Sequence, residues 1–255
     1  ADGQLVVDVF SFRKAHPFDP MDAAQARALR TFVDAIPEHA PHLRPEDIEA
    51  HCHRCRAAYL LATTPNRFFK HLALYDAVAG TEDVVTHVET VASVPGLSRF
   101  ILAAANANST SLFRRTARYL SSRGIDIQRA YLEAMGPAEG PTVSMISIVL
   151  VDPEGHVAQT DHPQWTQIRE DLARMPWLDR RVLQRANEHH REPGLSVVKC
   201  EILTALADLV HQRLGPTDPY RFSRDRVEEK VFQNLEMSLE LAELVVQLGD
   251  AARGG

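Results

Sequence analysis

Residues 98–133 read SRFILAAANANSTSLFRRTARYLSSRGIDIQRAYLE, and this stretch decides the fold that we expect. The apolar run Phe100–Ala105 predicts a buried strand, and the polar residues after it predict a loop. Ser109–Ser111 offers three hydroxyl groups that can cap a helix, in which apolar residues then recur at helical spacing. That helix should end at Gly124, and Ile127–Met135 predicts a second strand.

Further elements flank this stretch on both sides. The β-branched run Val84–Val91 predicts a strand before it. After it, Val143–Val151 is apolar on both faces and should be central in its sheet. Four apolar residues between Trp165 and Met175 then predict a second helix. The order strand, strand, helix, strand, strand, helix favours helices packed on a small sheet, so we predict an α+β fold, a ferredoxin-like sandwich, over residues 81–176.

Helical segments are expected at both ends of this domain. In the segment 1–80 we predict one short strand at 5–10 and helices at 21–36, at 45–62 and from Pro65 to near Gly80. The prolines at 37 and 41 should break the first of these helices. In the segment 177–255 we predict helices at 182–190, 195–214, 223–234 and 235–248. The sequence therefore predicts three parts, with boundaries near residues 80 and 176.

Composition excludes several classes of protein. The 255 residues are 45% hydrophobic and 24% charged, which is typical of a folded globular chain. Lys and Arg number 28 against 34 Asp and Glu, so the net charge of −6 offers no positive field for nucleic acid. Three cysteines cannot form a disulfide framework in a chain of this length, which favours a reducing compartment, and we expect the cytoplasm. No apolar run is long enough for a membrane span, and no signal peptide is recognisable.

Standard catalytic motifs are missing from the sequence. None of the 12 glycines makes a GxGxxG fingerprint or a phosphate-binding P-loop, and GxSxG, HExxH and EF-hand patterns are absent too. We therefore expect no catalytic residue, no metal and no cofactor in this chain.

The cluster His51-Cys52-His53-Arg54-Cys55 superficially resembles half of a zinc site. On one continuous helix over 45–62, Cys52 and Cys55 would lie in the apolar stripe, and His53 would point roughly 200° away from His51. A redox CxxC pair needs a helix N-terminus to lower its thiol pKa, whereas this pair would lie in the middle of a helix. We favour two buried thiols and histidines on the surface, with zinc binding and redox chemistry as the alternatives.

The turn between the strand 100–105 and the following helix is the candidate ligand site. Free backbone N–H groups and the helix dipole favour a carboxylate or phosphate there. The side chains that could orient such a ligand are Asn106, Asn108, Ser109, Thr110 and, one turn later, Arg114. Simple helix capping is the alternative.

A basic face follows on the same helix, with Arg114, Arg115, Arg118 and Arg123. We interpret it as a solvated surface with acidic neighbours. RNA binding would need exposed aromatic residues on the sheet, and the strands offer only a few, such as Phe100 and Tyr131.

The stretch 98–133 resembles an ACT-type regulatory domain, in which a strand runs into a loop, a helix and a turn to the next strand. With Thr64–His71 before the sheet and Tyr220–Glu229 after it, the chain is similar to the non-catalytic N-terminal part of the large NAD-dependent glutamate dehydrogenases. This resemblance implies a regulatory or scaffolding region, with NAD and the catalytic domain elsewhere in the same polypeptide. It also implies homo-oligomers and an amino-acid effector at 106–110. The Pro-Gly typical of that loop is absent, and the strand at 84–91 can take the fourth place in the sheet.

Three hypotheses follow. The first is an ACT-like regulatory segment that acts by assembly or by allosteric sensing of an amino acid. The second is a purely structural oligomerisation or interaction module that binds no small molecule. The third is a small enzyme or metal protein that uses His51, Cys52 and Cys55.

Overall fold

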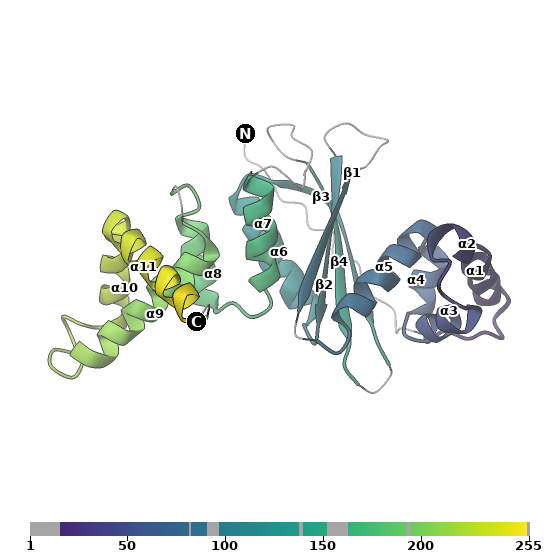
Figure 1. Ribbon diagram of the computed structural model, residues 1–255, viewed down its shortest axis with the longest axis horizontal. Helices are drawn as coiled ribbons and strands as arrows, with labels where there is room; N and C mark the ends of the chain where they lie inside the picture. The colour runs from purple at the N-terminus through teal and green to yellow at the C-terminus, as the bar shows by residue number, and fades with distance from the viewer. Residues whose placement is uncertain are drawn as a thin grey trace. The chain divides into compact units, whose positions relative to one another are not determined.

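The computed structural model describes residues 16–81, 83–90, 97–137, 140–151, 163–192 and 195–253 (Figure 1). The strand expected at 5–10 lies outside these residues. In the N-terminal part, the helices are α1 (Ala23–Asp34), α2 (Ile36–His39), α3 (Pro45–Cys52), α4 (Ala57–Ala62) and α5 (Pro65–Val78). In the middle of the chain come β1 (Val84–Thr90), β2 (Leu97–Ala105), α6 (Ser109–Ser122), β3 (Asp126–Met135), β4 (Val143–Val151) and α7 (Pro163–Arg174). The C-terminal helices are α8 (Arg180–Glu188), α9 (Val197–Leu214), α10 (Arg224–Gln233) and α11 (Leu235–Arg253).

The four strands form one antiparallel sheet in the order β1-β2-β4-β3. Its central strands are the most apolar ones: every described side chain of β4 except that of Val151 is buried, and β2 is buried from Phe100 onward. The edge strand β3 is the more exposed one, with only its last residue, Met135, buried. The four strands expected between residues 84 and 151 and the central place of β4 are confirmed. A strand that is apolar on both faces must be covered on both.

Two helices accompany the sheet, as expected from their apolar stripes. Leu112, Thr116 and Leu120 of α6 are buried, and Gly124, in the left-handed conformation at φ +74°, follows the end of the helix. In α7 the four stripe residues from Trp165 to Met175 are at most 1% exposed. Figure 1 shows α6 and α7 side by side, and a hydrogen bond between their side chains joins them. The helical predictions for this region are confirmed.

The chain divides into two compact units, which both contain parts of the sheet. The first comprises residues 1–85, 103–109 and 132–145, and the second comprises 86–102, 110–131 and 146–255. The division into three parts at residues 80 and 176 stays a prediction.

The helix expected over 45–62 is broken in two. It ends at Cys52, and α4 begins at Ala57 after a turn. Arg56 is extended and forms an antiparallel bridge with Pro17, beside a hydrogen bond from the Ala57 N–H to the carbonyl of His16. The residues at this break include no glycine or proline. The bridge from Arg56 to Pro17, about 40 positions away in the sequence, causes the break.

Proline acts differently than expected at the end of α1. Pro37 lies in the first turn of the short helix α2, where its missing N–H costs nothing, so it helps to start a helix there. The prediction that a helix begins at Pro65 is confirmed by α5. The hydroxyl of Thr64, its N-cap, accepts a hydrogen bond from the Arg67 N–H.

Ion pairs between side chains hold the C-terminal helices. Asp208 of α9 accepts hydrogen bonds from Arg181 of α8 and from Arg224 of α10. Glu228 of α10, which is almost fully buried, accepts from Arg181 and from Arg185. The two arginines lower the pKa of Asp208 to about 2.

Among the described residues, none of the helices is long and apolar enough to traverse a lipid bilayer.

Candidate functional site

The loop between β2 and α6 is held by hydrogen bonds to the segment that leads into β4. The backbone N–H of Asn106 donates to the carbonyl of Thr142 at 2.8 Å, and the hydroxyl of Ser144 donates to the carbonyl of Ala107 at 2.5 Å. Asn106 has a φ of +54°, a left-handed conformation that asparagine tolerates better than most residues. The sequence therefore places a residue suited to this turn where the strand must bend into the helix.

The predicted ligand-binding side chains lie on this loop and on the first turns of α6. Asn106, Asn108 and Thr110 are exposed, and Ser109 is half-buried. Arg114 is exposed too, one helical turn after Thr110. The first turn of α6 contains no acidic residue, so the positive end of the helix dipole meets no carboxylate of that turn. Such an arrangement can bind an anionic group, and the role of these five residues stays a prediction.

We expected the arginines of α6 and Arg123, which directly follows this helix, to form one solvated face, and they do not. Arg114 and Arg118 are exposed. Arg115, however, donates to the carbonyls of Met175 and Leu178 at 3.3 and 2.8 Å. The guanidinium of Arg123 lies 3.4 Å from the centre of the Tyr119 ring, a cation–π contact. The expectation was wrong for these two arginines, because they satisfy polar groups of other elements.

A buried carboxylate, that of Asp171 on α7, joins three helices. Its Oδ2 atom accepts a hydrogen bond from the Tyr119 hydroxyl of α6 at 2.5 Å. Its Oδ1 atom accepts from the Gln167 amide at 2.9 Å and from the backbone N–H of Val197, the first residue of α9, at 3.2 Å. Arg123 lies 3.8 Å from Oδ2. Asp171 is 1% exposed, so these groups replace the water that it would otherwise bind.

Burial and hydrogen bonding act in opposite directions on this carboxylate. Burial raises the pKa of Asp171, while the hydrogen bonds from Tyr119, Gln167 and Val197 and the charge of Arg123 lower it. Burial also raises the pKa of Tyr119, so the phenol stays protonated and donates a hydrogen bond to the carboxylate.

Our reading of the sequence missed this network, although the sequence contains a sign of it. Asp171 stands in α7 between Ile168 and Leu172, inside the apolar stripe that predicted the helix. A charged residue at such a position must find partners when the stripe is buried.

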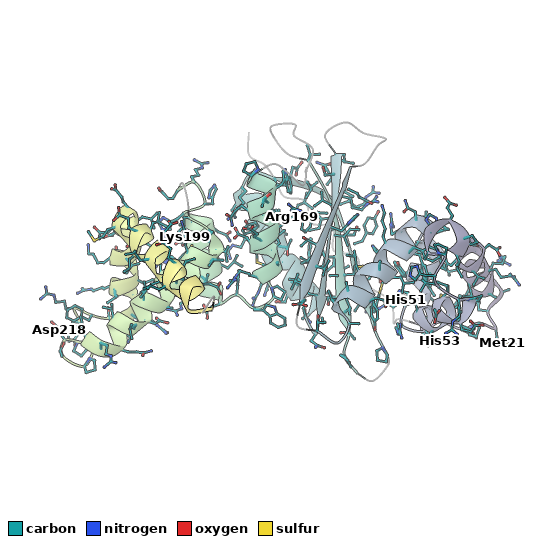
Figure 2. All side chains as sticks on the ribbon, in the orientation of Figure 1. Met21, His51, His53, Arg169, Lys199 and Asp218 are labelled. Atoms are coloured by element: carbon teal, nitrogen blue, oxygen red, sulfur yellow. The ribbon has the colours of Figure 1, made fainter. Side chains whose placement is uncertain are left out.

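The histidine of the N-terminal cluster is also placed differently than expected. His51 is fully buried, and its ring meets the rings of Phe68 and Tyr75 edge-on, at 5.4 and 5.2 Å between centroids. Neither of its ring nitrogens has a hydrogen-bond partner. His53 is exposed, as expected, and both histidines are labelled in Figure 2. The prediction of histidines on the surface was therefore wrong for His51, because α5 covers it.

Cys52 and Cys55 are free and buried, as we favoured. Burial raises the pKa of Cys52 to about 12 and raises that of Cys55 further. A thiol with such a pKa is a poor nucleophile near neutral pH, so burial is the reason that argues against redox chemistry, in place of the continuous helix that we assumed. In the part of the chain that the structure describes, no group of three or more metal-binding side chains comes together.

The aromatic residues of the strands do not form a stacking platform for bases. Phe100 is fully buried in the sheet, and Tyr131 on the edge strand β3 is 38% exposed. Base stacking needs exposed rings.

No protein-family model matches this chain, and no curated protein matches it significantly.

Proposed function

We propose that this chain is an ACT-like regulatory or scaffolding segment of a large NAD-dependent glutamate dehydrogenase, the class of enzyme that deaminates glutamate oxidatively to 2-oxoglutarate. In this proposal the loop before α6 senses an amino acid. The observation that carries the proposal is the strand order β1-β2-β4-β3, combined with the loop at the start of α6.

The strand order supports a ferredoxin-like sandwich by its internal symmetry. The crossover from β2 through α6 to β3 skips one position in the sheet, which β4 fills. An equivalent crossover from β4 through α7 would pass over β2 and place the next strand beside β2, on the side away from β4. In this chain β1 occupies that edge. In this proposal β1, which precedes the first helix of the sandwich, takes the place of its fourth strand.

The loop supplies groups that suit the α-carboxylate of an amino acid. The positive end of the helix dipole at the start of α6 would attract the carboxylate, as helix N-termini do. Asn108 and Thr110 would orient it, and the side chains of Asn106, Ser109 and Arg114 would complete the site. The amino acid acts as an effector here, since the reaction, NAD and the catalytic domain belong to another part of the same polypeptide. The three buried, unpaired cysteines are compatible with a cytoplasmic protein.

A thermal-shift screen of the chain against the standard amino acids, glutamate analogues and nucleotides tests the sensing function. A ligand that binds only the folded state at 100 times its Kd adds about 2.7 kcal/mol of stability and raises the Tm. The shift should be lost in Asn108→Ala and Thr110→Ala. It should persist in Asn66→Ala, a matched control with an exposed asparagine on α5. If no amino acid raises the Tm of the folded chain, the sensing function is refuted.

The second candidate function is a structural oligomerisation module, and α11 favours it. One face of α11 packs on α9 through the fully buried Ala242. Another face exposes apolar side chains, at 37 to 72% of their area, in a stripe with the spacing of a helix-pairing surface. The stripe consists of Met237, Leu241, Leu244, Val245 and Leu248.

The stripe is complementary to itself, so the occupant that fits it is a second copy of this chain. In an antiparallel pair of α11 helices, Met237 of one copy lies opposite Leu248 of the other, and Leu241 lies opposite Leu244. A two-fold interface requires this reciprocity, in which each residue of a pair occurs on both sides.

The charges beside the stripe allow such a pair. Glu240 would face Gln247 of the other copy, so no like charges meet at this flank. Glu243 is turned toward Lys199 of the same chain, with 3.1 Å between Nζ and Oε2.

Sedimentation velocity of the whole chain over a range of concentrations tests this second function. We expect a dimer that Leu244→Glu dissociates, because it buries a charge in the seam. Leu61→Glu, at a leucine of similar exposure on α4, is the matched control and should leave the dimer intact. A monomer at all concentrations, or equal effects of both variants, would refute pairing through α11.

A further inference from the structure

We propose that α6 and Asp171 form a coupling joint, through which a displacement of the first turn of α6 reaches the start of α9. The joint itself follows from the contacts. Its use in signalling by an amino acid rests on the proposed function.

One side of α6 carries all the parts of this joint. Arg115, Tyr119, Ser122 and Arg123 follow each other at helical spacing. The hydroxyl of Ser122 shares its proton between the carbonyl of Tyr119, at 2.8 Å, and the side-chain oxygen of Asn187 on α8, at 3.1 Å. Together with the bonds of Arg115 to the segment after α7, these contacts connect a single helix to α7, to α8 and, through Asp171, to α9.

Asp171 is the centre of the joint because its two oxygens face different helices. Oδ2 accepts from Tyr119 of α6, and Oδ1 accepts from the backbone N–H of Val197 at the start of α9. That N–H is one of the donors that a helix leaves free at its N-terminus, so the carboxylate also stabilises the first turn of α9. The hydroxyl of Ser196, the N-cap, accepts from the Lys199 N–H at 3.2 Å in the same turn.

Burial makes this connection stiff. If α6 shifts, the Tyr119 hydroxyl leaves a carboxylate that is only 1% exposed. A buried carboxylate that loses a donor is strongly destabilised, so Asp171 should follow Tyr119, and its hydrogen bond from the Val197 N–H then moves with it or breaks. Thr110 and Tyr119 are separated by nine residues of one helix, about 14 Å at 1.5 Å per residue. Because α6 moves as one rigid element, a shift of its first turn also displaces Tyr119 and the hydrogen bond from Tyr119 to Asp171.

Hydrogen exchange of the full chain, followed by mass spectrometry, tests the joint without any ligand. Tyr119→Phe removes one hydroxyl and keeps the ring beneath Arg123. We expect the amides at the start of α9, residues 197–204, to exchange about tenfold faster in this variant. Tyr220→Phe, which removes the hydroxyl of an exposed tyrosine, is the matched control and should change nothing there.

The reverse experiment uses the reciprocity of coupling. Ser196→Ala weakens the first turn of α9, and the faster exchange should reach residues 115–123 of α6 more than the rest of the second unit. A local role of Tyr119 would accelerate exchange only in α6 and α7. A general loss of stability would accelerate all segments by one factor. Either result would overturn the joint. Because no amino acid is added, failure here is distinct from failure of the thermal-shift screen.

Discussion

The burial of His51 leads to a pH dependence whose size follows from the structure. His51 is fully buried among aromatic rings, and both of its nitrogens lack a hydrogen-bond partner. Burial, with smaller contributions from the charges of Arg54 and His71, lowers its pKa from 6.5 to about 3. The imidazole is therefore neutral in the folded chain throughout the pH range in which it becomes charged in the unfolded chain.

The sign and the magnitude follow from proton linkage. Below pH 6.5 the unfolded state binds a proton at this residue and the folded state does not, so the free energy of unfolding falls as the pH falls, until about pH 3. Between pH 7 and pH 5 this single residue should cost about 2 kcal/mol. His51→Leu removes the group, and it also removes two buried nitrogens that lack partners, which cost roughly 1–3 kcal/mol when unpaired.

Urea unfolding, followed by circular dichroism at pH 7 and pH 5, measures both effects. His51→Leu should be at least as stable as the wild type at pH 7, and its loss of stability on going to pH 5 should be smaller by about 2 kcal/mol. His42→Leu, at an exposed histidine, is the matched control, since it leaves the buried ring in place. If wild type and His51→Leu lose the same stability between the two pH values, the argument from burial is refuted.

Two further predictions concern the thiols and a glycine. All three cysteines are buried with raised pKa values. A thiol reagent at pH 7.5 should therefore label none of them within minutes in the folded chain and all three in denaturant. Rapid labelling of the folded chain would contradict this prediction. A Cβ added at Gly136 would lie 2.7 Å from the backbone oxygen of Pro141, so Gly136→Ala should lower the stability to urea by about 1–3 kcal/mol. Gly80→Ala, with open space around its Cβ, should cost only the backbone strain of its positive φ, about 1 kcal/mol, and equal losses would refute the steric reason.

The local elements of the fold could be predicted from short patterns. The run 143–151 is apolar at successive positions and becomes the buried strand β4. Thr64 with Pro65 starts α5, and Gly124 follows the end of α6. These features depend on residues within one or two turns of each other, so the sequence contains the information directly.

Contacts between distant residues decided the rest. The helix over 45–62 breaks because Arg56 pairs with Pro17, and nothing in the residues at the break indicates it. For Cys52 and Cys55, burial replaces the continuous helix as the reason to expect low reactivity.

By itself, the sequence determined an α+β chain with a central apolar strand, with helices at both ends, and with a polar loop before α6. Only the tertiary structure decided that His51 is buried without a partner and that Asp171 is buried with four. The physical reason is that the fate of a polar side chain depends on what packs over it. For His51, and for Asp171 apart from Gln167 of its own helix, those groups come from helices that lie elsewhere along the chain, and no local pattern specifies them.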